Sequence, residues 1–160
     1  MSAARVLVAG VGNVFFKDDA FGVEVAERLA REPFPADVRV ADFGIRGVHL
    51  AYEIAGGAYD VVVFVDAVDR RAAPGELFVI EPERDVAGSP VADAHSMELE
   101  NVFAHVARLG GTTARFLLVG CQPADAGDGM GLSPAVAAAV PAAVRLVTEL
   151  VRKQRSEVTV

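Results

Sequence analysis

The sequence has a single cysteine, Cys121, which excludes an internal disulfide and fits a reducing compartment such as the cytoplasm. It also lacks a basic excess, since 15 lysines and arginines stand against 22 aspartates and glutamates, a net charge of −7. Nucleic acids and anionic membranes are bound by basic patches, so neither is expected as the main partner. The first apolar run, Val6–Ala9, is too short to span a bilayer and ends at a glycine turn. We therefore expect no signal peptide and no membrane insertion.

Apolar residues are abundant and make up 52% of the 160 positions. A chain of this length fits one domain with a sizeable core. We place that domain at residues 1–155 and expect residues 156–160 to form a loose C-terminal tail.

Short apolar segments alternate with segments of helical periodicity along the chain. The expected strands are residues 5–10, 38–43, 59–67, 76–80 and 115–120, and the expected helices are residues 19–31 and 48–55, a helix around 99–106 and one that starts at 133–134 with Ser133 as its N-cap. The run 61–65 is apolar on both faces, as in a central parallel strand. This order predicts a three-layer α/β/α sandwich with a mostly parallel, twisted five-stranded sheet. Strand 76–80 follows a tight turn and is a candidate for antiparallel pairing.

Three ionisable residues fall where an open α/β sheet builds its site, at the carboxyl edge of the strands. Asp19 follows the first strand, Asp66 stands at the end of the most apolar strand, and His95 stands at the start of a helix. His95 precedes Leu99 of the apolar stripe by one helical turn, which places it on the inward face. Two carboxylates and one imidazole suit a catalytic divalent ion such as zinc or nickel.

Each of these residues also has a purely structural interpretation. Asp18 or Asp19 could cap the first helix, Asp66 could cap the turn after its strand, and His95 could be an ordinary helix-start histidine. Asp18 is undecided between a helix cap and a catalytic proton acceptor.

The remaining histidines and the cysteine are weaker candidates. His49 and His105 fall on polar helix faces, where we expect them to be solvated. Cys121 ends a buried strand, where a cysteine usually serves as a small apolar filler.

The turn Gly10-Val11-Gly12 resembles the start of a dinucleotide-binding fingerprint. However, Phe15 occupies the position of the third glycine, and two carboxylates follow at Asp18 and Asp19. Carboxylates at this place would repel a pyrophosphate, so we expect no nucleotide cofactor.

Five motifs, in order along the chain, resemble the nickel–iron hydrogenase maturation endopeptidases. They are GVGNVFFKDDAFG (Gly10–Gly22), DFGIRG (Asp42–Gly47), VVVFVDAVD (Val61–Asp69), DAHSMEL (Asp93–Leu99) and GCQP followed by GLSPAV (Gly120–Val136). The resemblance extends over almost the whole chain. It implies a metal site at Asp19, Asp66 and His95, the same residues that position alone selects.

The resemblance further implies an endopeptidase that removes the C-terminal extension of a hydrogenase large-subunit precursor after nickel insertion. Nickel is then the favoured metal, either resident or supplied by the substrate. The loop with Asp42, Gly44 and Gly47 is a candidate for binding the extended peptide. Relatives often have Asp-Gly-Gly-Thr here, whereas this chain has Asp-Phe-Gly-Ile. The loop alone therefore leaves open which substrate it recognises.

In this interpretation a metal held by Asp19, Asp66 and His95 polarises the scissile carbonyl or activates water. Asp18 is the candidate proton acceptor, and backbone N–H groups near Gly10–Asn13 are candidates for an oxyanion site.

Two other classes of function stay open at this point. One is a cysteine hydrolase that uses Cys121, His95 and Asp66. The other is a non-catalytic assembly factor that recognises nickel in the precursor without cutting it.

Overall fold

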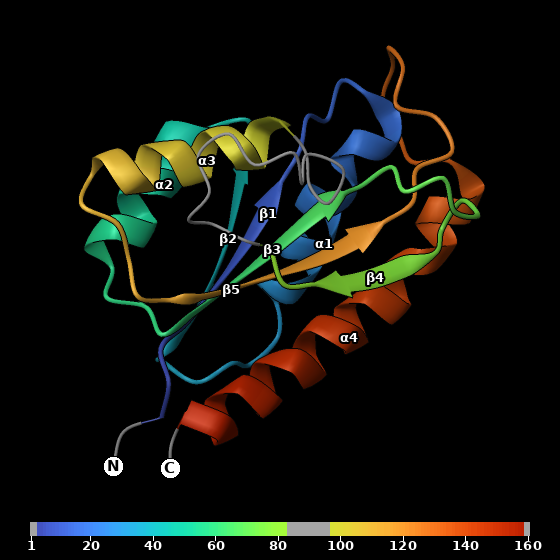
Figure 1. The fold of residues 1–160 in the computed structure, drawn as a ribbon. Coiled ribbons are helices and arrows are strands. Elements are labelled where there is room, and N and C mark those ends of the chain that lie inside the picture. Colours follow the sequence, from blue (N-terminus) through green and yellow to red (C-terminus); the bar gives the residue numbers. More distant parts are fainter. Residues whose placement is uncertain (1–2, 83–96, 159–160) are drawn as a thin grey trace.

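The computed structural model describes residues 3–82 and 97–158, and these form three layers (Figure 1). The strands are β1 (Val6–Val11), β2 (Val38–Gly44), β3 (Val61–Ala67), β4 (Leu77–Ile80) and β5 (Arg115–Cys121). The helices are the 3₁₀ helix η1 (Lys17–Ala20) and the α-helices α1 (Phe21–Leu29), α2 (Gly47–Gly56), α3 (Met97–Arg108) and α4 (Pro134–Val158). The expected α/β/α sandwich is confirmed.

The strands form one sheet in the order β2-β1-β3-β5-β4. All pairs are parallel except β4 with β5, which is antiparallel as the tight turn before β4 suggested. β3 pairs with β1 on one side and β5 on the other, which explains why its residues are apolar on both faces. The carboxyl ends of β1, β2, β3 and β5 consequently meet at one edge of the sheet.

Helices cover both faces of the sheet (Figure 1). On one face, α1 and α4 pack against Val61, Val63 and Val65 of β3. On the other face, α2 and α3 pack against Val62 and Phe64. The alternation of side chains along β3 thus divides the core into two clusters that share the same strands.

α4 continues to Val158, so it includes most of the stretch expected to be a loose tail. By length and composition alone, its residues 134–156 would suffice to cross a bilayer. In the fold, however, Val136, Val140, Val147 and Val151 are buried against the sheet. The apolar character of α4 is therefore explained by the core.

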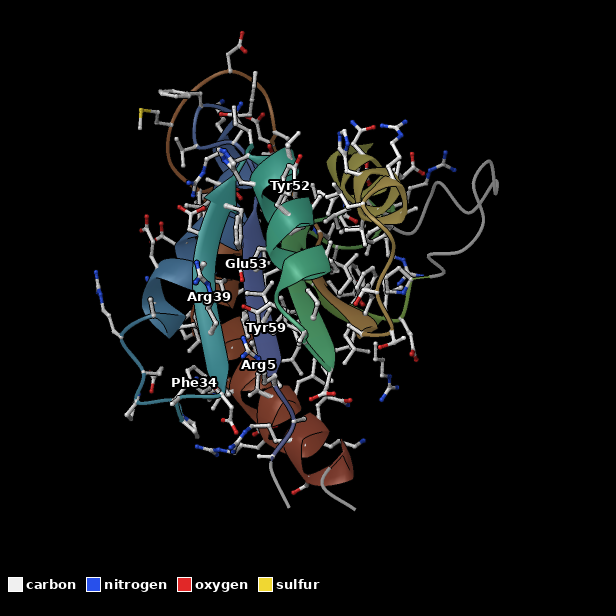
Figure 2. The ribbon with its side chains drawn as sticks, turned by 90° about the vertical axis from the view of Figure 1, so that its left-hand side faces the viewer. Arg5, Phe34, Arg39, Tyr52, Glu53 and Tyr59 are labelled. Carbon is white, nitrogen blue, oxygen red and sulfur yellow. The ribbon has the colours of Figure 1, made fainter. Side chains whose placement is uncertain are left out.

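Polar contacts tie α2 to the amino-terminal end of the sheet (Figure 2). Glu53 accepts a hydrogen bond of 2.8 Å from the Tyr59 hydroxyl and lies 3.4 Å from the Arg39 guanidinium. The guanidinium of Arg5 lies 5.0 Å from the centre of the Tyr59 ring. These contacts, with the buried Leu50 of the same helix, fix α2 over β1 and β2.

The first helix begins later than expected from the sequence. Residues 17–20 form η1, and α1 starts only at Phe21, with Ala20 at its N-cap position. Within the described chain no side chain caps this helix end, so the capping role considered for Asp18 and Asp19 is wrong for α1.

Candidate functional site

Two glycines allow η1 and α1 to sit directly on the ends of the central strands. A Cβ atom on Gly22 would lie 2.0 Å from the carbonyl oxygen of Val65 and 2.3 Å from that of Val11. A Cβ atom on Gly12 would lie 1.9 Å from the carbonyl oxygen of Asp19, and Gly12 has a φ of +147°. The glycines of the first motif thus serve close packing of the chain on itself.

Asp19 is held at this edge by the turn that follows β1. Its Oδ2 atom accepts a hydrogen bond of 2.9 Å from the backbone N–H of Asn13. The side chain is half-buried, and burial raises the pKa of its carboxyl, an effect that the Asn13 N–H only partly offsets. A partly desolvated carboxylate of this kind would gain from a nearby cation.

Asp66 is the second carboxylate at this edge, near the end of β3. It is fully buried, at 0% exposure. Because side chains alternate along a strand, Asp66 lies on the same face as Val62 and Phe64, the face that α2 and α3 cover. Its neighbour Val65 is the residue on which Gly22 packs, and η1 contacts β3, so Asp19 and Asp66 come from elements in contact.

His95, the third residue selected from the sequence, lies outside the described residues. Among residues 3–82 and 97–158, no group of three or more His, Cys, Asp and Glu side chains is arranged to hold a metal ion. The structure therefore brings together the elements that carry Asp19 and Asp66, and the triad with His95 stays a prediction. Two desolvated carboxylates at one edge are compatible with a divalent cation, which would offset their cost of burial.

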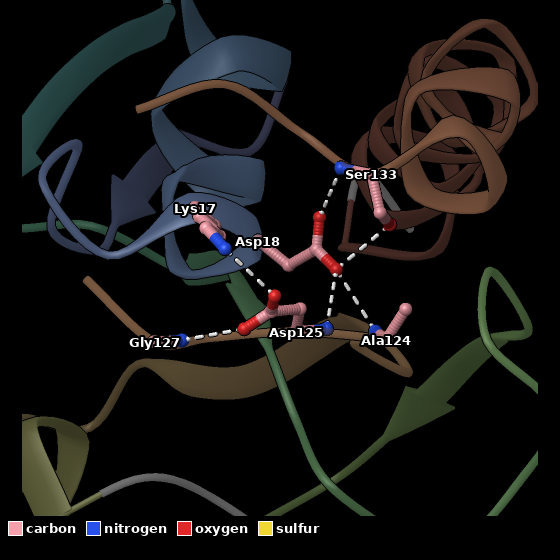
Figure 3. Close-up of polar contacts among 6 residues, drawn as sticks. All are labelled: Lys17, Asp18, Ala124, Asp125, Gly127 and Ser133. Atoms are coloured by element: carbon pink, nitrogen blue, oxygen red, sulfur yellow. Dashed lines mark hydrogen bonds and ion pairs between the residues drawn. The ribbon is translucent and has the colours of Figure 1, made fainter. Parts of the chain in front are cut away.

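Asp18 is surrounded by hydrogen-bond donors (Figure 3), whereas its neighbour Asp19 accepts one backbone N–H. Asp18 is fully buried and accepts four hydrogen bonds of 2.7 to 2.9 Å from the loop between β5 and α4. The donors are the backbone N–H groups of Ala124, Asp125 and Ser133 and the hydroxyl of Ser133. Asp18 thus joins η1 to a loop more than a hundred residues away.

These hydrogen bonds favour the ionised form of Asp18. Burial opposes ionisation, but the donors from Asp125, Ser133 and Ala124 outweigh it, and the net effect lowers the pKa of Asp18. A carboxylate with a lowered pKa and four donors is a poor proton acceptor. The geometry favours an anchoring role for Asp18 over the catalytic role expected from the sequence.

Ser133 directly precedes α4, as expected from the sequence, and the same network gives its side chain a second role. Its backbone carbonyl accepts the N–H of Ala137, as at a helix N-cap. Its hydroxyl, however, donates to Oδ2 of Asp18 at 2.8 Å. Ser133 is therefore the partner of a buried carboxylate from another part of the chain, which no local pattern could have indicated.

The loop after β2 is rigidly built around Asp42. Its Oδ1 atom accepts the N–H of Gly44 at 2.7 Å, and Gly44 has a left-handed φ of +52°. The Arg46 guanidinium donates to the carbonyl oxygens of Asp42 and Phe43 at 2.6 and 3.2 Å. Asp42 thus shapes the loop that presents Gly44 and Gly47, and its expected contact with substrate stays a prediction.

Gly44 and Gly47 line a pocket of about 190 Å³ between this loop, α2 and α3. Asn101 and His105 of α3 line the pocket as well. His105, expected to be solvated on a polar helix face, is half-buried and lines this pocket. Ile45 and Val48 beside the glycines are exposed apolar residues, a property that only the structure shows.

Cys121 is fully buried at the end of β5, and burial raises the pKa of its thiol to about 11. A thiol with this pKa carries almost no thiolate at neutral pH and is unsuited as a nucleophile. The environment of Cys121 argues against the cysteine hydrolase interpretation.

Known proteins resemble this chain over most of its length. A family model described as hydrogenase maturation protease matches residues 23–150, a range that contains Asp66 and His95 and begins just after Asp19. The hydrogenase expression/formation protein HupD of Rhodobacter capsulatus is 36% identical over 159 residues, which cover 97% of this chain and 75% of that protein.

Two solved structures share the fold. The hydrogenase maturating endopeptidase HybD from E. coli gives a TM-score of 0.77 at 29% identity and covers 93% of both chains. The NiFe hydrogenase maturation protease HycI from Thermococcus kodakarensis gives a TM-score of 0.74 at 30% identity and covers 95% of this chain and 93% of its own. The mostly parallel five-stranded sheet with its helices is thus the fold of these proteases.

Proposed function

Because the chain belongs to the hydrogenase maturation protease family, we propose that it is an endopeptidase that removes the C-terminal extension of a nickel–iron hydrogenase large-subunit precursor. We further propose that cleavage follows nickel insertion. The observation that carries the proposal is the pair of desolvated carboxylates, Asp19 and Asp66, at the carboxyl edge of the sheet. That edge is where open α/β sheets build their sites.

Asp19, Asp66 and His95 would hold a divalent ion, for which nickel is favoured, whether resident or carried by the precursor. When bound, the ion supplies Lewis-acid polarisation of the scissile carbonyl. Asn13 orients the Asp19 carboxylate through its backbone N–H, and the fold excludes water from Asp66. Asp18 keeps η1, and with it Asp19, in place against the loop 124–133.

The partner in this proposal is the large-subunit precursor, in the cytoplasm. Asp18 has a lowered pKa and accepts four hydrogen bonds, and Asp19 is a proposed metal ligand. Neither of these adjacent aspartates is therefore a candidate for the general base. A water molecule or a group of the substrate itself would then accept the proton.

The proposal is tested by incubating the purified protein with nickel-loaded and nickel-free precursor and measuring the mass of the large subunit. We expect loss of the C-terminal peptide only from the nickel-loaded form. An unchanged mass together with stable binding would instead support the non-catalytic assembly factor.

A matched pair of histidine variants tests the ligand set in the same assay. His95→Ala should abolish processing, because it removes the only nitrogen donor of the proposed set. His49→Ala should not, because His49 is exposed on α2 and does not line the pocket. Equal activity of the two variants would remove His95 from the site.

A further inference from the structure

We propose that the pocket between the loop after β2, α2 and α3 receives one bulky apolar side chain of the substrate, close to the bond that is cut. The inference rests on the proposed function and adds to it a specificity site of defined chemistry. It follows from the size of the pocket, its lining, its position and the rigidity of its walls.

The size of the pocket suits a single side chain. An apolar cavity of about 150 Å³ is enough to hold benzene, and this pocket has about 190 Å³. Pockets for drug-sized ligands and cofactors are larger, about 300 to 1,000 Å³. A leucine, methionine or phenylalanine side chain therefore fits, and a nucleotide does not.

The lining of the pocket is mostly apolar. Val11, Phe43, Leu50 and Val102 are buried and form the floor. At the rim, Ile45 is 66% exposed and Val48 is 49% exposed. Exposed apolar side chains at a rim favour an apolar occupant, because its binding removes both surfaces from water.

The pocket lies on the face of the sheet to which Asp66 belongs. Its floor residues belong to the core cluster beneath α2 and α3, as do Val62 and Phe64, which precede Asp66 on the same face of β3. A substrate chain that reaches Asp66 from this side would pass the pocket.

A short chain of hydrogen bonds also connects the pocket to Asp19. The carbonyl oxygen of Gly44, in the pocket wall, accepts the N–H of Gly12 at 3.1 Å. The next residue, Asn13, donates its N–H to Asp19. Asp19 is thus linked to the pocket wall by two hydrogen bonds, and Asp66 belongs to the same face of the sheet as the pocket floor.

The walls of the pocket are already in place without substrate. The Asp42 carboxylate and the Arg46 guanidinium fix the loop through hydrogen bonds to its backbone. Glu53 and Tyr59 fix α2. A preformed pocket costs little ordering entropy on binding, so it can discriminate between side chains.

Asn101 and His105 are the polar residues of the lining. Both can donate and accept hydrogen bonds. At the α3 side of the pocket they are suited to the backbone amides that flank an apolar side chain in an extended peptide. The pocket thus follows the usual pattern of an apolar site with a few polar groups that fix orientation.

The test uses a charge placed at the rim and a matched charge outside the pocket. Val48→Glu puts a carboxylate on the rim, and Tyr52→Glu puts one on the next turn of α2, where Tyr52 is exposed and does not line the pocket (Figure 2). Both substituted positions are exposed, so both variants should fold. Each enzyme is given nickel-loaded precursors that carry leucine or lysine at each position on either side of the cut bond, and kcat/KM is measured.

We expect wild type to prefer leucine over lysine by about tenfold or more at one position. Val48→Glu should reduce that ratio by about tenfold, because lysine now meets a carboxylate, and Tyr52→Glu should leave it unchanged. If the leucine-to-lysine ratio of kcat/KM is unchanged in Val48→Glu, or changes equally in both variants, the proposed role of the pocket is wrong. The proposed function would be unaffected by that result. If wild type cuts no nickel-loaded precursor, the proposed function fails, and the inference fails with it.

Discussion

At the scale of single residues, Asp18 and Asp19 have opposite environments although they are adjacent in the chain. Asp18 is buried among four donors that lower the pKa of its carboxyl. Asp19 receives one backbone N–H, and burial raises the pKa of its carboxyl. Ionised Asp18 therefore stabilises the fold, whereas ionised Asp19 opposes it. A structural acid and a ligand acid are expected to differ in this way.

We predict that Asp18→Asn lowers the free energy of unfolding by about 1–3 kcal/mol at neutral pH, because buried donors lose a charged acceptor. The folded pKa of Asp18 lies below its ordinary value of 3.8. Its contribution is therefore complete above that pH and is lost as the pH falls through the lower, folded value. Urea unfolding of wild type and variant at neutral and acidic pH measures both effects, and the difference in stability should shrink in acid.

Asp19→Asn is the matched control for this prediction. It removes the same charge one residue away and keeps an oxygen that can accept the Asn13 N–H. Its free energy of unfolding should equal or exceed that of wild type at neutral pH, and processing should be lost. A destabilisation as large as that of Asp18→Asn would contradict the division of roles.

For Cys121 we predict that replacement by alanine leaves processing close to the wild-type rate. The thiol is fully buried with its pKa raised to about 11, so it has no part in attack on the substrate. Mass spectrometry of the precursor after incubation with the variant checks this. Complete loss of processing by a folded Cys121→Ala protein would revive the cysteine hydrolase interpretation.

At the scale of elements, the strands were predictable because most of them are short apolar runs bounded by turn residues. The buried stripe of α3, with Leu99, Val102 and Val106, also followed from periodicity. The break between η1 and α1 could not be predicted from periodicity, since it depends on how closely Gly22 packs on Val65. Contacts between elements override local pattern at this point.

We predict that Gly22→Ala is strongly destabilising, by about 3 kcal/mol or more, because its Cβ would overlap backbone atoms that cannot move away. The nearest of these atoms is the Val65 carbonyl oxygen, at 2.0 Å. Gly56→Ala, at the end of α2, is the control, since a Cβ there meets nothing within 4 Å. Chemical unfolding of both variants should show a loss for Gly22→Ala and no loss for Gly56→Ala. Similar stabilities would contradict the close approach.

At the scale of the whole molecule, the carboxyl edge and its residue Asp66 were predictable because an alternating order of strands and helices fixes where parallel strands end. The pairing of Asp18 with Ser133 and the pocket at His105 could not be predicted from the sequence. Both depend on segments that meet only in the folded chain, and a single sequence carries no record of such meetings. Helical periodicity placed His105 on a polar face but could not show that this face borders a pocket.

The two core clusters share the strands of one sheet, which predicts that the molecule unfolds as one unit. Far-UV circular dichroism reports the helices on both faces, and tyrosine fluorescence is expected to report the buried Tyr59 under α2. The two signals should give coincident thermal transitions. Separate midpoints would show that the faces unfold independently.

The hydrogen bonds between Asp18 and Ser133 also have a consequence for synthesis. A growing chain cannot close this contact until the ribosome has released the segment that follows β5, after most of the protein has been made. Until then the Asp18 carboxylate lacks its four donors, and Asp19 has the N–H of Asn13 but not the anchor beside it. A chain that ends before Ser133 therefore lacks the anchor beside Asp19, and we expect it to process the precursor less well than a chain that extends past this residue.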